Sequence, residues 1–186
     1  VLLPHAAGGR RAGRRDTLAA VADVDLDGFP DLAIAFQNHP DSGVRVFSGK
    51  TGATIFDLVD LTTLAFGMGR GLAGLGDVNS AGVPDIAVAD PDAVTAISYS
   101  GKVWMFSGAD ASVLTTIDGI AEYGGFGFQL AALGDLHGDG VSDFAAAAGS
   151  GTQVHSGATG AVLKMLPAGD GLAGPGDVNR DGKPDV

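Results

Sequence analysis

One acidic motif recurs four times along the chain, each time beside a short apolar run. Its first copy lies in VADVDLDGFPDLAIAF at 21–36, and the others lie in GLGDVNSAGVPDIAVAD at 74–90, ALGDLHGDGVSDFAAAA at 132–148 and GPGDVNRDGKPDV at 174–186. The leading aspartates are Asp23, Asp77, Asp135 and Asp177, separated by 54, 58 and 42 residues. Spacing of this length indicates a repeat protein, so we expect each copy to belong to one structural unit.

A second motif keeps the same spacing in the first three units. It reads VRVFSGKTGATIF at 44–56, VWMFSGADASVL at 103–114 and TQVHSGATGAVL at 152–163. In each copy a Ser-Gly pair and a small polar turn separate two apolar segments, which is typical of a β-hairpin. Each unit is therefore predicted to contain four strands. In the second unit these strands are expected at 70–76, 86–90, 102–107 and 112–117.

Four strands in a unit of about 40–58 residues is the period of a β-propeller blade. We predict an all-β fold, a partial β-propeller of three four-stranded blades and the start of a fourth. The predicted bounds are 1–16 for an N-terminal tail, 17–60, 66–118 and 124–167 for the blades, and 170–186 for the incomplete blade. A sandwich would not keep two motifs in phase, and a helical solenoid lacks such frequent turns. Since propellers close with four to eight blades, we expect an arc with apolar faces at both ends.

The spacing D-x-D-x-D-G-x-x-D places oxygen ligands at loop positions 1, 3, 5 and 9, and the glycine at position 6 permits a sharp turn. Carboxylates this close repel one another unless a cation joins them. Ca²⁺ accepts six to eight oxygens and fits this set better than Mg²⁺, which requires a tighter octahedron. A backbone carbonyl at position 7 completes the set. The candidate metal ligands are Asp23, Asp25, Asp27, Phe29 and Asp31; Asp77, Asn79, Val83 and Asp85; Asp135, His137, Asp139, Val141 and Asp143; and Asp177, Asn179, Asp181, Lys183 and Asp185.

The four loops differ in their ligands. The first and the last have a full set of side-chain oxygens, whereas the third has His137 at position 3, where a neutral imidazole is a poor ligand for a hard cation. The second has Ala81 at position 5, a vacancy that water would fill. An alternative is that some loops are metal-free turns held by hydrogen bonds of their Asp and Asn side chains. An EF-hand is disfavoured because strands flank the loops and position 12 holds Ile34, Val88 or Ala146 in place of an acid.

The charge of the chain agrees with cation binding. Its net charge is -11, and 21 of its 22 acidic residues are aspartates, of which 12 lie in the four loops. Four Ca²⁺ ions would change the net charge from -11 to -3. A net negative charge argues against nucleic acid as a partner. The basic segment GGRRAGRR at 8–15 is expected to be a solvated tail, with a polyanion-binding arm as the alternative.

Two further features restrict the chemistry of the chain. Cysteine is absent, which excludes disulfides, thiolate metal sites and cysteine nucleophiles. No apolar run has the length of a membrane-spanning helix, so no membrane span is expected in this segment.

These residues resemble the FG-GAP repeats of the integrin α-subunit propeller, which also occur in bacterial surface proteins. In that family an aromatic-Gly pair precedes the leading aspartate by nine residues; Phe126-Gly127 matches this pair, and Met68-Gly69 matches it in part. Ala89-Asp90-Pro91 stands at the position of the family's Gly-Ala-Pro. The resemblance covers about residues 17–186. It implies a calcium-binding segment of a secreted or cell-surface protein, a protein or glycan ligand, and further blades in a longer parent chain.

Three functions stay open on the sequence. The first is a non-catalytic propeller segment for adhesion or protein interaction, the second a carbohydrate-binding or substrate-positioning module beside an enzyme domain, and the third an enzyme. The four histidines are His5, His39, His137 and His155. None lies in a nucleophile-elbow or zinc motif, which disfavours the enzyme. Since His155 occupies a hairpin position held elsewhere by Phe47 and Phe106, we expect it at the core edge or the surface.

Exposed aromatic side chains would favour the carbohydrate-binding alternative, because sugar rings stack on them. The candidates are Trp104, Tyr99 and Tyr123. Trp104 lies in a predicted strand, where burial in the core is expected.

Overall fold

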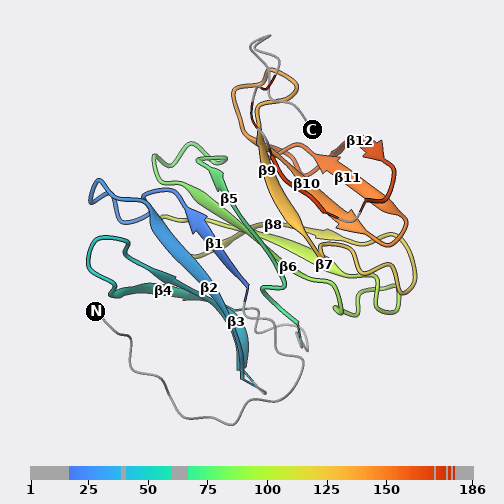
Figure 1. Cartoon of the computed structure of the whole chain (residues 1–186), viewed down its shortest axis with the longest axis horizontal. Coiled ribbons are helices and arrows are strands. Elements are labelled where there is room, and N and C mark those ends of the chain that lie inside the picture. Colours follow the sequence, from blue (N-terminus) through green and yellow to red (C-terminus); the bar gives the residue numbers. More distant parts are fainter. Residues whose placement is uncertain are drawn as a thin grey trace.

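The computed structural model describes residues 17–38, 41–59, 67–169, 171–174, 176 and 178. These residues form twelve strands in three four-stranded antiparallel sheets (Figure 1). Within this part of the chain, no helix has the length and apolar character needed to cross a membrane. The arginine-rich N-terminal segment lies outside the described residues.

Each sheet is a simple meander in which sequential strands pair. The first sheet consists of β1 (Leu18–Val21), β2 (Asp31–Asn38), β3 (Asp41–Phe47) and β4 (Thr54–Leu58). The second consists of β5 (Gly71–Gly76), β6 (Asp85–Asp90), β7 (Lys102–Phe106) and β8 (Val113–Asp118). The third consists of β9 (Leu130–Gly134), β10 (Asp143–Ala148), β11 (Gly151–His155) and β12 (Val162–Leu166).

The strands follow the repeated motifs. The first three acidic motifs each connect the first strand of a sheet to the second, and each Ser-Gly motif connects the third strand to the fourth. The fourth acidic motif lies almost entirely outside the described residues. In the second unit every strand begins and ends within one residue of its predicted bounds. The first strands β1, β5 and β9 lie next to one another in this order, with the sheets fanning outward from them (Figure 1). This is the blade arrangement of a β-propeller, and the predicted fold class is confirmed.

The middle sheet is packed on both of its faces. On β6, Ile86 and Val88 belong to the core shared with the first sheet, whereas Ala87 and Ala89 belong to the core shared with the third. The alternation follows the two-residue period of a strand. All six residues of β6 are buried as a result. Trp104 on β7 is 2% exposed and packs in the core shared with the first sheet, so its predicted burial is confirmed.

The cores between sheets combine large side chains with small ones. Ala33 and Ala35 of the first sheet belong to the same core as Ile86 and Val88. Phe144 of the third sheet belongs to the same core as the alanines of β6. Pairing bulky residues of one sheet with alanines of the next lets the sheets approach closely without a void.

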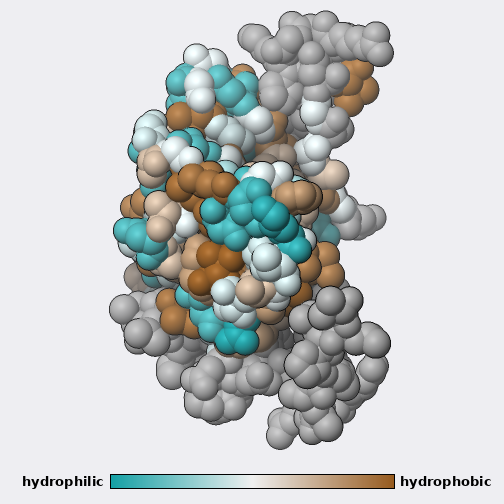
Figure 2. Space-filling view, turned by 90° about the vertical axis from the view of Figure 1, so that its left-hand side faces the viewer, coloured by the Kyte–Doolittle hydropathy of each residue, from teal (hydrophilic) through white to brown (hydrophobic). Residues whose placement is uncertain are grey.

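The opposite face of the first sheet carries a second row of apolar side chains. Leu32, Ile34 and Phe36 alternate with the core alanines of β2 and are half-buried. Arg45 on the neighbouring strand covers the ring of Phe36 at 5.5 Å from its centroid and pairs with Asp57. Figure 2 shows the side of the molecule that lies on the left in Figure 1, where hydrophobic patches alternate with hydrophilic ones.

The two aromatic-Gly positions lie between blades. Met68 and Phe126 are 0% and 1% exposed, each in the core between two sheets. The glycine that follows has a positive φ, and a Cβ there would lie 2.6 Å from the Cβ of Ala35 at Gly69 and 2.5 Å from that of Ala89 at Gly127. Glycine at this position thus permits close contact with the preceding blade.

His155 is a core residue, which the sequence did not distinguish from a surface one. Its side chain is 1% exposed and stacks on Phe144, with ring centroids 5.3 Å apart and an interplanar angle of 13°. Its Nδ1 lies 2.9 Å from the carbonyl oxygen of Gly160 and donates to it, while Nε2 has no hydrogen-bond partner among the described residues. Burial lowers the pKa of His155 below its ordinary value.

This lowered pKa predicts acid sensitivity. The folded protein binds a proton at His155 less tightly than the unfolded chain does. The free energy of unfolding therefore has its full value above a pH of about 6.5 and falls as the pH drops below it. The slope attributable to one such group approaches about 1.4 kcal/mol per pH unit. We expect His155→Phe to remove this contribution, measured as the difference in unfolding free energy between variant and unmodified protein from pH 7 to 5. Parallel curves for the two proteins over this range would contradict the prediction.

Candidate metal-binding loops

The leading aspartate of each described loop holds the turn that follows it. Asp23 accepts hydrogen bonds from the backbone N–H of Asp27 at 2.9 Å and of Gly28 at 2.7 Å, one on each carboxylate oxygen. Asp77 and Asp135 accept the equivalent two bonds in the second and third loops. The glycine at position 6 has a φ between +82° and +92° in all three, a conformation that disfavours other residues. The three loops therefore share one backbone geometry.

The first loop gathers three carboxylates. One oxygen from each of Asp23, Asp25 and Asp27 lies within 4.8 Å of the other two. Phe29 at position 7 is half exposed, and its N–H donates to Asp27 Oδ1 at 3.0 Å. Lys50 is the nearby cation, with Nζ 3.2 Å from the carbonyl oxygen of Asp27. Hard, negatively charged oxygens at this separation are the donor set that Ca²⁺ prefers.

The second loop has fewer acidic ligands. Asp77 and Asn79 both accept a hydrogen bond from the N–H of Ala81, at 3.0 and 2.9 Å. Val83 is half-buried, and Asp85 is fully buried. Among the described residues, no group of three acidic or histidine side chains gathers here. The turn is well formed without a carboxylate at position 5.

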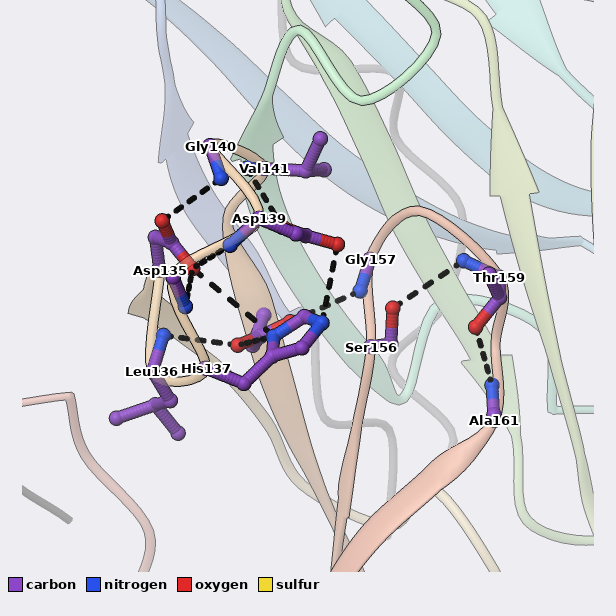
Figure 3. Close-up of polar contacts among 12 residues, drawn as sticks. Asp135, Leu136, His137, Asp139, Gly140, Val141, Ser156, Gly157, Thr159 and Ala161 are labelled. Carbon is purple, nitrogen blue, oxygen red and sulfur yellow. Dashed lines mark hydrogen bonds and ion pairs between the residues drawn. The ribbon is translucent and has the colours of Figure 1, made fainter.

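In the third loop an imidazole lies among the carboxylates (Figure 3). His137 Nδ1 is 2.9 Å from Asp143 Oδ2, and Nε2 is 3.0 Å from Asp139 Oδ2. Asp135 is close enough to form a three-residue cluster with His137 and Asp143, in which ligand atoms lie within 4.8 Å of one another. The hydrogen bond to Asp143 is the largest cause that raises the pKa of His137 above its ordinary value. Val141 at position 7 donates its N–H to Asp139 Oδ1 at 2.8 Å.

The aspartate at position 9 has a structural role that the sequence did not reveal. In the three described loops it is at most 2% exposed, and one of its oxygens accepts a hydrogen bond from the backbone N–H of the residue at position 2. Its other oxygen accepts the N–H of the glycine in the Ser-Gly motif. These pairs are Asp31 with Gly49 at 2.9 Å, Asp85 with Gly108 at 3.0 Å and Asp143 with Gly157 at 3.2 Å. The acidic loop and the Ser-Gly turn therefore contact each other through this hydrogen bond, which Figure 3 shows for Gly157.

Close packing explains the glycine of the Ser-Gly motif. A Cβ on Gly49, Gly108 or Gly157 would lie 1.9 Å from the carbonyl oxygen of the residue before the position-9 aspartate. No side chain fits at that distance, so the hairpin turn can approach the acidic loop only with glycine. Burial raises the pKa of Asp85, and the hydrogen bonds from Gly108 and Val78 oppose this rise.

The structure brings together only part of the predicted ligand set. It clusters the first three aspartates of the first loop, and Asp135, His137 and Asp143 of the third. The predicted ligands that lie outside the described residues are Asp177, Asn179, Asp181, Lys183 and Asp185.

Comparisons with known proteins find similarity to one curated protein and to solved structures that share the fold. No family model matches it. Human integrin alpha-7 is 31% identical over 137 residues, which cover 67% of this chain and 11% of that protein. The chain therefore corresponds to a small part of the integrin subunit, and the similarity fits the FG-GAP resemblance of the repeats.

Two solved structures share the fold. A rhamnogalacturonan lyase of Bacillus licheniformis aligns with a TM-score of 0.56 and 18% identity, over 98% of this chain and 42% of the lyase chain. A chain in the crystal structure of BBS1N in complex with ARL6DN aligns with a TM-score of 0.51 and 12% identity, over 84% of this chain and 45% of that one. At such identities these matches bear on the fold alone.

Proposed function

We propose that the chain is a calcium-binding, non-catalytic β-propeller segment of a secreted or cell-surface protein, with a role in adhesion or protein interaction. The observation that carries this proposal is the carboxylate cluster of Asp23, Asp25 and Asp27, on a loop whose turn is already formed. The similarity to integrin alpha-7 supports an adhesion or interaction module. The proposal includes blades at 17–60, 66–118 and 124–167 and a further one from residue 170.

Extracellular placement follows from the expected affinity. Calcium loops of extracellular modules bind with a dissociation constant of about 10⁻⁴–10⁻³ M, which matches the calcium level outside cells and far exceeds that of the cytosol. Loops with a vacancy, such as the second, would stay empty in the cytosol. Saturation of all loops well below micromolar calcium would remove this argument.

The metal assignment is tested by calorimetric titration of chelator-treated protein with CaCl₂. We expect Asp25→Asn to weaken the first loop's binding, because it removes a charge from the cluster while keeping an acceptor for the N–H of Asp27. Asp118→Asn is the matched control, since it removes an exposed carboxylate that pairs with Lys102 at the end of the second sheet opposite to its acidic loop. Equal titrations of unmodified protein and the Asp25 variant would contradict the assignment.

Adding the missing carboxylates is expected to improve the two imperfect loops. Ala81→Asp supplies a carboxylate at position 5 of the second loop. His137→Asp replaces an imidazole that contacts two carboxylates of the third loop. Each change adds a hard oxygen ligand, so we expect a gain of about tenfold or more in affinity at the altered loop, about 1.4 kcal/mol. The number of ions bound at millimolar calcium, measured by equilibrium dialysis, should rise accordingly. No change in either variant would show that these loops are metal-free turns.

The adhesion role needs a separate test. Beads coated with the chain are applied to a panel of immobilised matrix proteins and glycans, in calcium and in chelator. We expect calcium-dependent attachment to at least one surface and weaker attachment with Asp25→Asn. Attachment to none, or attachment indifferent to calcium, would speak against the proposal.

The histidine environments support a non-catalytic role. Of the histidines that the structure describes, His137 is bonded to loop carboxylates and His155 is buried against aromatic rings. The fold that this chain shares with the rhamnogalacturonan lyase does not imply lyase activity, because proteins of one fold can carry different functional sites.

A further inference from the structure

The connection between β6 and β7 differs from its counterparts. It spans 91–101, whereas two residues connect β2 to β3 and two connect β10 to β11. A long connection on a compact scaffold is a common place for binding residues. It lies against the segment 119–129 between β8 and β9, to which it is held by three backbone hydrogen bonds. These run from Gly119 to Gly101 at 2.8 Å, from Tyr123 to Ser98 at 3.0 Å and from Phe126 to Ser100 at 3.0 Å.

Both tyrosines of the chain meet where these two connections touch. Their rings stack with centroids 5.5 Å apart and an interplanar angle of 15°, and Tyr99 and Tyr123 are nevertheless 48% and 72% exposed. Aromatic side chains held in place while facing solvent are typical of binding surfaces. We call this pair the tyrosine platform.

The backbone under the tyrosine platform is strained. Tyr99 and Tyr123 have φ values of +49° and +53°. Residues other than glycine rarely adopt this left-handed conformation, and bulky ones least of all. The conformation costs about 1–3 kcal/mol for each residue. Such strain concentrates at functional sites, where the surrounding structure maintains it.

A shallow cavity, widely open to solvent, lies beside the tyrosine platform. It has a volume of about 290 Å³ and is lined by Pro91, Asp92, Tyr99, Tyr123 and Gly125. This is just below the range of about 300–1,000 Å³ that is usual for small-molecule sites, and it has room for about one sugar ring. Asp92 supplies an acceptor, and Arg70, whose Nη1 is 2.6 Å from Asp92 Oδ2, supplies donors at the same edge.

We propose that the tyrosine platform and its cavity bind a neutral pyranose unit of a glycan. The apolar face of the sugar would lie on an exposed tyrosine ring, and neighbouring hydroxyls would bond to the carboxylate of Asp92 and the guanidinium of Arg70. The site is separate from the acidic loops, so this proposal does not depend on calcium.

The geometry favours a neutral sugar over a cation or an anion. A cage for a cation surrounds it with rings at steep angles, whereas Tyr99 and Tyr123 stack nearly parallel on each other and are both exposed, which suits a sugar stacked on one ring. The carboxylate of Asp92 is already neutralised by Arg70. The net charge of -11 disfavours polyanionic glycans.

The test uses the whole chain labelled with ¹³C-tyrosine, in which both tyrosine signals report on this site. The probes are cellotriose, maltotriose, mannotriose, galactotriose and chitotriose at millimolar concentration, with trigalacturonate and tetramethylammonium as charged alternatives. We expect shifts of the tyrosine ring signals with at least one neutral trisaccharide. Shifts with the charged probes only, or with none of the seven, would overturn the proposal.

Variants separate ring stacking from folding. Tyr123→Asn removes the ring but tolerates a left-handed backbone, and we expect it to weaken binding about tenfold or more, while Tyr123→Phe retains binding. Phe128→Ala is the control, because Phe128 is a partly exposed aromatic residue on the same connection that does not line the cavity. The fluorescence of buried Trp104 confirms folding of each variant. Equal loss in the Tyr123→Asn and Phe128→Ala variants would overturn the assignment.

Discussion

Replacement of Gly108 by alanine is expected to destabilise the protein by about 3–5 kcal/mol. The added Cβ would lie 1.9 Å from the carbonyl oxygen of Pro84, so the turn must move away from the acidic loop. That movement breaks the buried hydrogen bond from the Gly108 N–H to Asp85. For a chain of this size we expect the melting temperature to fall by roughly 6–20 °C, measured by calorimetry in calcium-free buffer.

The matched control is Gly149→Ala. Gly149 also lies in a turn between two strands, but a Cβ there would meet only the carbonyl oxygen of Gly124, at an ordinary 3.5 Å. Asp85→Asn tests the same contact from the other side. Since Gly108 and Asp85 share one hydrogen bond, the double variant should lose less than the sum of the single losses. Additive losses, or a Gly108 variant as stable as the control, would show that the contact between Gly108 and Asp85 does not stabilise the fold.

Calcium is expected to raise the melting temperature in a concentration-dependent manner. An ion that binds the folded loop and not the unfolded chain stabilises the fold by RT ln(1 + [L]/Kd). With a dissociation constant of about 10⁻⁴–10⁻³ M, ~10 mM calcium stabilises by about 1.4–2.7 kcal/mol for each filled loop. This corresponds to roughly 3–11 °C for each loop in a chain of this size, measured by differential scanning calorimetry against a chelator-treated sample.

Two controls make this measurement specific. NaCl at matched ionic strength separates binding from the screening of loop charges. A variant with Asp23, Asp25 and Asp27 changed to asparagine should lose the part of the response that the first loop contributes. Identical melting curves in chelator and in calcium would exclude metal binding by the folded loops.

The strand pattern and the turns could be predicted from local sequence. Alternating apolar residues, glycine at position 6 and the Ser-Gly turns are each determined by neighbours in the chain, so the meander was predictable. The segment Phe144–Ala148 is alanine-rich and has helix propensity, yet it forms β10. Its two neighbouring strands supply hydrogen bonds along both edges, and tertiary context decides its conformation.

The features that escaped prediction depend on contacts between distant segments. Asp85 and Gly108 are 23 residues apart, and nothing in either motif shows that one bonds to the other. The stacking of Tyr99 on Tyr123 requires two separate connections to be held together by the fold. His137 was expected to be a poor ligand, and its bonds to Asp139 and Asp143 became apparent only from the folded loop.

Because the middle sheet packs on both faces, the three sheets form a short row in which each one contacts only its neighbours. The first and third sheets belong to separate cores and are joined through the alternating side chains of β6 and β7. In such arrays each unit derives its stability from its immediate neighbours, so a perturbation travels from one unit to the next and weakens with distance. A further blade beside the first or the third sheet would therefore need to match only the core face of its immediate neighbour, with bulky side chains opposite alanines as in the two existing cores.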